Sequence, residues 1–159
     1  MDSRGFSLIE LMMVVVVIGI VLTAGLPAFG TFRDGLMIVQ ARSQLTQDLR
    51  LARQVAVTRH CPVVVTFGDG VTTTDVGNYT VLYDTDGNGV LSTGERTFNR
   101  AMPSRTRLSK ITLSPTDKVT FDMSGVLALG TGGGQLILAT SRGRVDTLMV
   151  SAAGVVYRP

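Results

Sequence analysis

The sequence has little of the chemistry on which disulfide-linked, zinc-binding or catalytic proteins depend. Its 159 residues include one cysteine, one histidine and no tryptophan. Because Cys61 is alone, no disulfide can form within the chain, and Cys61 with His60 cannot complete a zinc site without carboxylate ligands. No spacing of serine, cysteine, histidine and carboxylates nominates a nucleophile with its base. We therefore expect the protein not to be an enzyme.

Charged residues are also few, and apolar residues are unevenly placed. Charged side chains make up 17% of the sequence, with a net charge of +3 that does not by itself indicate nucleic-acid binding. The hydrophobic content is 45% and the mean hydropathy +0.32, and most of this excess lies between Phe6 and Phe29. The rest of the chain is typical of one ordinary globular domain.

No charged residue occurs between Leu11 and Leu22. The apolar run from Phe6 to about Leu26 would form a helix of about 30 Å, which matches the hydrocarbon core of a bilayer. A secretory signal peptide fits poorly, because the run is too long and no small-residue cleavage site ends it. The sequence therefore predicts a membrane-spanning helix.

Glu10 is the residue that a plain membrane anchor does not explain. A carboxylate at this depth costs a few kcal/mol unless it is neutralised or paired. The nearest cation, Arg4, is six residues upstream. A new α-amino group at Phe6, made by cutting the chain after Gly5, would lie one helical turn from Glu10. An amine from a neighbouring subunit would make Glu10 a device that fixes the register of packed helices.

The segment "RGFSLIEL", together with the apolar run after it, resembles the N-terminus of type IV prepilins and of type II secretion pseudopilins. The resemblance implies that a prepilin peptidase cleaves after Gly5, removes residues 1–5 and N-methylates Phe6. It also implies that Glu10 aids assembly by attracting the terminal amine of an adjacent subunit, and that Pro27 kinks the helix.

A second helical pattern follows Pro27, which is expected to break or kink the first helix. Leu45, Leu49, Ala52 and Ala56 recur on one face, so residues 30–60 are predicted to form an amphipathic helix that packs on a sheet. The stretch "QDLRLARQVAVTRH" resembles the GspH/FimT group of the superfamily. In that group an "AR-x-x-A" segment ends the long helix and a β-rich domain follows.

Beyond Cys61 the apolar period changes to two, and short β-type runs alternate with clusters of Gly, Asp, Asn, Ser and Pro. We expect an α+β, pilin-like fold, in which the long N-terminal helix packs on a mainly antiparallel β-rich head. The glycine-rich residues 130–135 lack the lysine of a phosphate-binding loop and are expected to connect two strands. The expected segments are a leader at 1–5, a transmembrane or filament-core helix at 6–29, the amphipathic helix at 30–60 and the head at 61–159.

The stretch "DTDGNGVLSTGE", residues 84–95, matches the spacing of a calcium-binding loop. A bound calcium ion would stiffen the loop and bind in the weak range of extracellular modules. The alternative is a hairpin loop that turns at Asn88-Gly89, with aspartates present for turn geometry. The candidate ligands are Asp84, Asp86, Asn88, the carbonyl of Val90, Ser92 and Glu95.

Arginines gather near the C-terminus at Arg142, Arg144 and Arg158, and such cations could bind DNA phosphates without sequence preference. Some FimT-type pilins resemble DNA receptors that use a C-terminal Gly-Arg-x-Arg stretch. Here Val155 follows Gly154, and Arg158 stands one place late. The alternative interpretation is a set of charges along a solvated sheet edge.

The resemblance implies a minor structural subunit of a type IV pilus. Such a protein is held in the bacterial inner membrane with its head in the periplasm, and is then built into a filament. Its partners would be the prepilin peptidase, the other pilins, the inner-membrane assembly platform and membrane lipid. No cofactor is expected, apart from the calcium alternative. A GspH-like minor pseudopilin of type II secretion is one alternative, and a DNA-binding FimT-like pilin in natural transformation is another.

Overall fold

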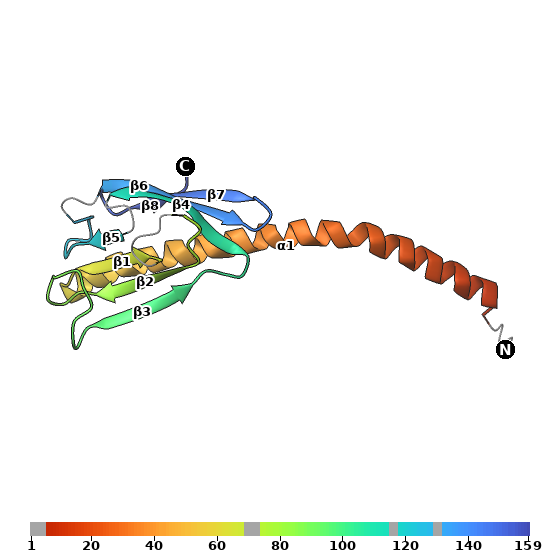
Figure 1. Ribbon diagram of the computed structural model, residues 1–159, viewed down its shortest axis with the longest axis horizontal. Helices are drawn as coiled ribbons and strands as arrows, with labels where there is room; N and C mark the ends of the chain where they lie inside the picture. The colour runs from red at the N-terminus through yellow and green to blue at the C-terminus, as the bar shows by residue number, and fades with distance from the viewer. Residues whose placement is uncertain (1–5, 69–73, 115–117, 129–131) are drawn as a thin grey trace.

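A computed structural model describes residues 6–68, 74–114, 118–128 and 132–159, and the side chains of residues 24–28 lie outside this description. A single long helix, α1 (Leu8–Arg59), projects far beyond a head made of strands. Figure 1 shows the strands of the head lying along the C-terminal half of α1, while the N-terminal half extends alone. The predicted α+β pilin-like fold is confirmed.

Helix α1 is continuous over 52 residues, so Pro27, which was expected to break or kink the helix, does not break it. Proline removes one N–H from the helical ladder, and such a loss can curve a helix without ending it. Figure 1 shows α1 curving over its projecting half. The helix begins after Ser7 in an extended conformation and ends at His60, which adopts the left-handed conformation with φ 50°. Residues 29 and 30 both lie inside α1, so the two expected helical segments are halves of one helix.

The C-terminal half of α1 buries one face against the head. Leu45, Leu49, Ala52 and Ala56 are buried as the helical period predicted, and Ile38 extends the same face toward the N-terminus. Spacings of three and four residues keep these side chains in one stripe along the helix. The stripe orients α1 toward both sheets.

The described strands form two four-stranded antiparallel sheets, which also confirms the β-rich head. The first has the order β3-β2-β1-β5, and the second has the order β4-β6-β7-β8. The strand bounds are β1 (Val63–Phe67), β2 (Asn78–Tyr83), β3 (Arg96–Ala101), β4 (Thr106–Ser114), β5 (Lys118–Phe121), β6 (Gly132–Thr140), β7 (Val145–Val150) and β8 (Val156–Tyr157).

The glycine-rich segment is part of a strand and not only a loop, because β6 already begins at Gly132. A side chain at Gly134 would collide with the carbonyl oxygen of Thr112, and one at Gly133 with that of Val150. The glycines therefore allow neighbouring backbones to approach closely, next to a shift in register between Thr112 and Ser114. Residues 129–131 lie outside the description.

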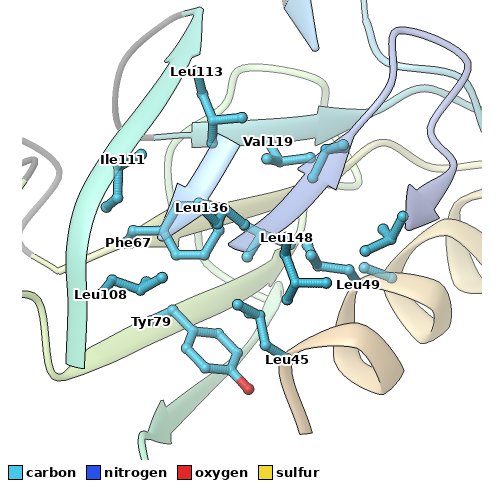
Figure 2. Packing of buried hydrophobic residues seen from close by; sticks show 14 of the residues in the cluster. Leu45, Leu49, Phe67, Tyr79, Leu108, Ile111, Leu113, Val119, Leu136 and Leu148 are labelled. Carbon is cyan, nitrogen blue, oxygen red and sulfur yellow. The ribbon is translucent and has the colours of Figure 1, made fainter. Parts of the chain in front are cut away.

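The core lies between α1 and the two sheets. Figure 2 shows side chains from the helix and from both sheets meeting in one cluster, with Tyr79 and Phe67 as its largest fully buried members. Its labelled members are Leu45, Leu49, Phe67, Tyr79, Leu108, Ile111, Leu113, Val119, Leu136 and Leu148. The cluster joins elements that are far apart in the chain, so the head and the second half of α1 form one folding unit.

The buried stripe of α1 predicts a contrast between two leucines. Leu45 is 0% exposed and Leu36 is 54% exposed. Leu45→Ala should lower the free energy of unfolding by about 2–5 kcal/mol because it leaves a cavity in the core. Leu36→Ala should change it by about 0.5 kcal/mol or less. Chemical denaturation of the two full-length variants measures both values, and equal losses would contradict the assigned face.

Candidate functional site

The projecting half of α1 exposes a long apolar surface. Every large hydrophobic side chain described between Phe6 and Leu22 is exposed, and Glu10 is the single charged residue among them. An exposed apolar surface of this size marks a site of contact with protein or lipid. Within the described residues, no helix is long and apolar enough to cross a membrane.

Glu10 lies in the first turn of α1. The backbone N–H groups of Glu10 and Leu11 both donate to the carbonyl oxygen of Ser7, each at 3.1 Å. A carboxylate in the first helical turn is favoured by the helix dipole. In the described part of the chain, no cation forms an ion pair with Glu10. Gly5 and the side chain of Pro27 lie outside the described residues, so the roles expected of Gly5, Phe6, Glu10 and Pro27 stay predictions.

The head meets the projecting helix at a segment that we call the neck, residues 30–35 of α1. Asp34 is the central residue of the neck, with a side chain only 3% exposed. Its Oδ2 lies 3.4 Å from Nε of Arg142, and its Oδ1 lies 3.9 Å from Nη1 of Arg105. The carboxylate oxygens of Asp34 accept no hydrogen bond in the described structure, so the charges of these two arginines are what balances it.

Two glycines make room for the arginines on the helix. The guanidinium of Arg142 lies directly over Gly30, and that of Arg144 lies over Gly35, where a Cβ would be 2.6 Å from Nη1. Any larger residue at either position would displace the arginine above it. The neck is therefore shaped to receive flat guanidinium groups.

Two turns of the head deliver these arginines. Arg142 and Arg144 lie in the turn between β6 and β7, and Arg105 precedes β4 in the left-handed conformation with φ 69°. The N–H of Ser141 donates to the carbonyl oxygen of Arg105 at 2.9 Å, which ties the two turns together. The hydrogen bond therefore holds the two turns together where their arginines contact the neck.

Arg158 makes a second connection to α1. Asp146 of β7 lies 3.3 Å from Nε of Arg158 and 3.1 Å from Nη1 of Arg42 on the helix. The arginines proposed from sequence for DNA binding therefore each contact α1, or a carboxylate that pairs with a residue of α1. They are Arg142, Arg144 and Arg158.

Sequence reasoning missed Asp34 and Asp146. Asp34 carried a usable signal, because it precedes Ile38 by four residues on the buried face, where a carboxylate needs a cation.

The loop between β2 and β3 brings together three of the six residues proposed for calcium. Carboxylate oxygens of Asp84, Asp86 and Glu95 lie within 4.8 Å of one another. Asp84 is buried and accepts hydrogen bonds from the N–H groups of Asn88 at 3.1 Å and Gly89 at 2.7 Å. These bonds within the loop are those expected of the turn interpretation.

The other three residues are arranged less favourably for a cation. The side-chain amide of Asn88 donates to Asp86 at 2.8 Å and to the hydroxyl of Ser92 at 2.7 Å, and its oxygen accepts the N–H of Val90 at 2.7 Å. The calcium interpretation requires the Asn88 oxygen as a ligand. The hydrogen bonds of the Asn88 side chain therefore support a loop that is stabilised by its own hydrogen bonds. Calcium binding stays a prediction.

Comparison with known proteins places the chain in a family. A family model described as type II transport protein GspH matches residues 41–154. The chain belongs to the GspH family. A second model, the prokaryotic N-terminal methylation motif, matches residues 1–26, which include Gly5, Phe6 and Glu10. The proposed membership of the pilin and pseudopilin superfamily is thus confirmed, and this GspH protein is structural and not an enzyme.

Two crystal forms of the type IV minor pilin FimU from Pseudomonas aeruginosa strain PAO1 are similar in structure. One has 17% sequence identity and a TM-score of 0.55, and covers 80% of this chain and 92% of its own. The other has 18% identity and a TM-score of 0.50, and covers 76% and 90%. At these identities the likeness shows the fold alone. No curated protein matches the sequence.

The buried pairing at the neck predicts that Asp34 stabilises the head on α1. Asp34→Asn should lower the free energy of unfolding by about 1–3 kcal/mol, since it leaves polar atoms buried without the charge that the arginines balance. Asp75→Asn is the matched control, because Asp75 pairs with Arg107 at an exposed site and should contribute about 0.5 kcal/mol or less. Thermal denaturation of the full chain compares them, and a larger loss from Asp75→Asn would contradict the assignment.

The loop predicts a pH dependence at Glu95. Hydrogen bonds from the N–H of Ser92 foremost, and then of Thr85 and Asp86, lower the pKa of Glu95 below its ordinary value of 4.5. The folded loop is therefore favoured above pH 4.5 and loses this stabilisation as the pH falls through the lowered pKa. The amide protons of Thr85 and Ser92 should be protected from exchange at pH 6 and lose protection in acid.

Glu95→Gln is the control for that pH dependence, because the amide cannot titrate and should abolish the transition. Protection of the Thr85 and Ser92 amides in the presence of a calcium chelator supports the turn interpretation. Protection that develops only when calcium is added would overturn it in favour of the metal interpretation.

Proposed function

We propose that this protein is a minor subunit of a type IV pilus filament, made as a membrane-anchored precursor and assembled through α1. The observation that carries the proposal is the apolar surface exposed between Phe6 and Leu22, in which Glu10 is the single charged residue, on a helix whose other half buries one face against its own head. Lipid covers such a surface in the precursor. Neighbouring helices replace lipid in the filament, because both surroundings are apolar.

The proposed precursor is held in the bacterial inner membrane by residues Phe6 to about Leu26, with its head in the periplasm. A helix of this length reaches across the hydrocarbon core of about 30 Å. The match of residues 1–26 to the N-terminal methylation motif supports this part of the proposal.

Processing then prepares the helix for assembly. A prepilin peptidase cleaves after Gly5 and methylates the new amine of Phe6, and other pilins and the inner-membrane assembly platform receive the mature subunit. Glu10 lies four residues after Phe6, in the first turn of α1, and is exposed. An amine from a neighbouring subunit pairs with Glu10 and sets the register of the two helices.

A minor pseudopilin of type II secretion is the second candidate. The match to the type II transport protein GspH supports it. The protein would then belong to a short periplasmic filament that pushes folded proteins outward, through the same helix and the same pairing. Deleting its gene in the native host separates the two candidates: loss of surface pili supports the first, and loss of secreted enzymes supports the second.

The proposal predicts that Glu10→Ala blocks assembly and spares insertion. In the native host, the variant should stay in the inner membrane in normal or greater amount, because an apolar side chain replaces a carboxylate. Its incorporation into filaments should fall at least about tenfold, the equivalent of about 1.4 kcal/mol of lost pairing. Quantitative immunoblots of membrane and sheared-filament fractions measure both quantities.

Val15→Ala is the matched control, since it shortens a neighbouring exposed side chain without changing charge. The intact mass of the membrane form should show the loss of residues 1–5 and one added methyl group in both variants. Normal incorporation of Glu10→Ala would refute the pairing, and an uncut chain in a host with an active peptidase would refute the proposed processing.

A further inference from the structure

The end of the head that faces the projecting helix carries a group of arginines, which we call the arginine collar: Arg105, Arg142 and Arg144. All three approach the neck, where they contact Asp34, Gly30 or Gly35. Figure 1 shows the turn between β6 and β7 lying against α1 where the helix leaves the head. The collar therefore lies at the end of the head from which the N-terminal half of the helix projects.

The collar has spare charge and exposed donors. One buried carboxylate, Asp34, stands against three arginines, so the collar retains a positive excess. The side chains of Arg105 and Arg142 are 46% and 49% exposed, and Arg144 is also exposed. Arginine offers five N–H donors, so one edge of the guanidinium can face Asp34 while another binds a phosphate group.

The height of the collar along α1 matches the thickness of a bilayer. Gly30, under Arg142, lies 24 residues after Phe6, and Gly35, under Arg144, lies 29 residues after it. At about 1.5 Å per residue, these positions are about 36 and 44 Å from Phe6. A bilayer measures about 40–45 Å across when its headgroups are included. With Phe6 at one edge of the hydrocarbon core of about 30 Å, Gly30 lies about 6 Å beyond the opposite edge, in the headgroup layer.

Two aromatic side chains reinforce this placement. Phe29 and Phe32 are exposed on α1, Phe29 just before the neck and Phe32 within it. Phenylalanine next to cationic side chains is typical of segments that lie at the boundary between headgroups and acyl chains. Along the helix, the apolar surface is followed by a short zone in which these aromatic side chains and the collar arginines occur together, as at the headgroup boundary of a membrane.

We propose that the arginine collar binds the phosphate groups of anionic phospholipids and seats the head on the outer face of the inner membrane before assembly. This inference rests on the proposed function, because it needs α1 to be inserted. DNA offers the same phosphate chemistry. The collar, however, lies against one side of the base of a helix that is already surrounded by lipid, and lipid phosphates lie at its height.

The test places the full chain in vesicles of neutral phosphatidylcholine, with or without about one-third anionic phosphatidylglycerol. A fluorophore on Ser141→Cys reports on the collar, and the native Cys61 is buried. Lipids that carry a quencher on the headgroup measure contact. Quenching should be greater in anionic vesicles and should weaken as salt screens the arginines.

Substitutions assign the contact to the collar. Arg142→Gln and Arg144→Gln should each reduce the ratio of lipid-bound to free heads about fivefold in anionic vesicles, as expected for one cation near an anionic surface. Arg142→Lys and Arg144→Lys keep the charge and should retain most of the quenching. Arg59→Gln, at the far end of α1, is the matched control and should change nothing.

Each remaining outcome is decisive. Failure of the chain to float with either vesicle would refute membrane insertion, and the collar proposal with it. Flotation with equal quenching in neutral and anionic vesicles would refute the collar proposal alone. Short duplex DNA is then added to the anionic vesicles. If DNA displaces the heads from the lipid, at a DNA concentration at which the Arg142→Gln and Arg144→Gln variants bind no DNA, the collar proposal is overturned in favour of a DNA site.

Discussion

The burial of one face of α1 by two sheets is the interaction on which the rest of the head depends. The stripe that includes Leu45 and Leu49 supplies the helical side of the core, and neither sheet has another helix to pack against in the described structure. Apolar packing of this kind is strong but has no preferred direction. Alone, it would allow the sheets to slide or rotate on the helix.

Carboxylate–arginine pairs at the edges of the stripe limit that freedom. Asp34 binds two turns at the neck, Asp146 binds Arg42 from β7, and Asp48 lies 3.5 Å from Arg100 of β3. The helix members of these pairs are Asp34, Arg42 and Asp48, which lie at successive positions along α1, and their partners come from both sheets. Because each requires a particular partner at a particular place, we infer that they specify how the head sits on the helix more than they add to its stability.

The sequence predicted those parts of the fold that depend on local periodicity. Spacings of three and four residues gave the buried face of α1, and alternation gave a β-rich head. The pairing of Arg142 with Asp34 joins residues more than 100 positions apart, so no local pattern contains it. The sequence left open whether Pro27 breaks or bends the helix; α1 continues through it because one missing N–H weighs little within a helix of 52 residues. The calcium spacing did predict that Asp84, Asp86 and Glu95 converge, but not that backbone N–H groups would occupy their oxygens.

The edge strands of the two sheets affect whether neighbouring heads can join through their strands. An uncovered edge strand offers free N–H and C=O groups to any other strand nearby. Among the described strands, the edges β5 and β8 have four and two residues, while β3 carries Arg96 and Arg100 and β4 carries Arg107 and Lys110. Short strands and repeated positive charge both disfavour sheet-to-sheet joining. Heads held at high density can therefore stand side by side without merging into a continuous β-aggregate.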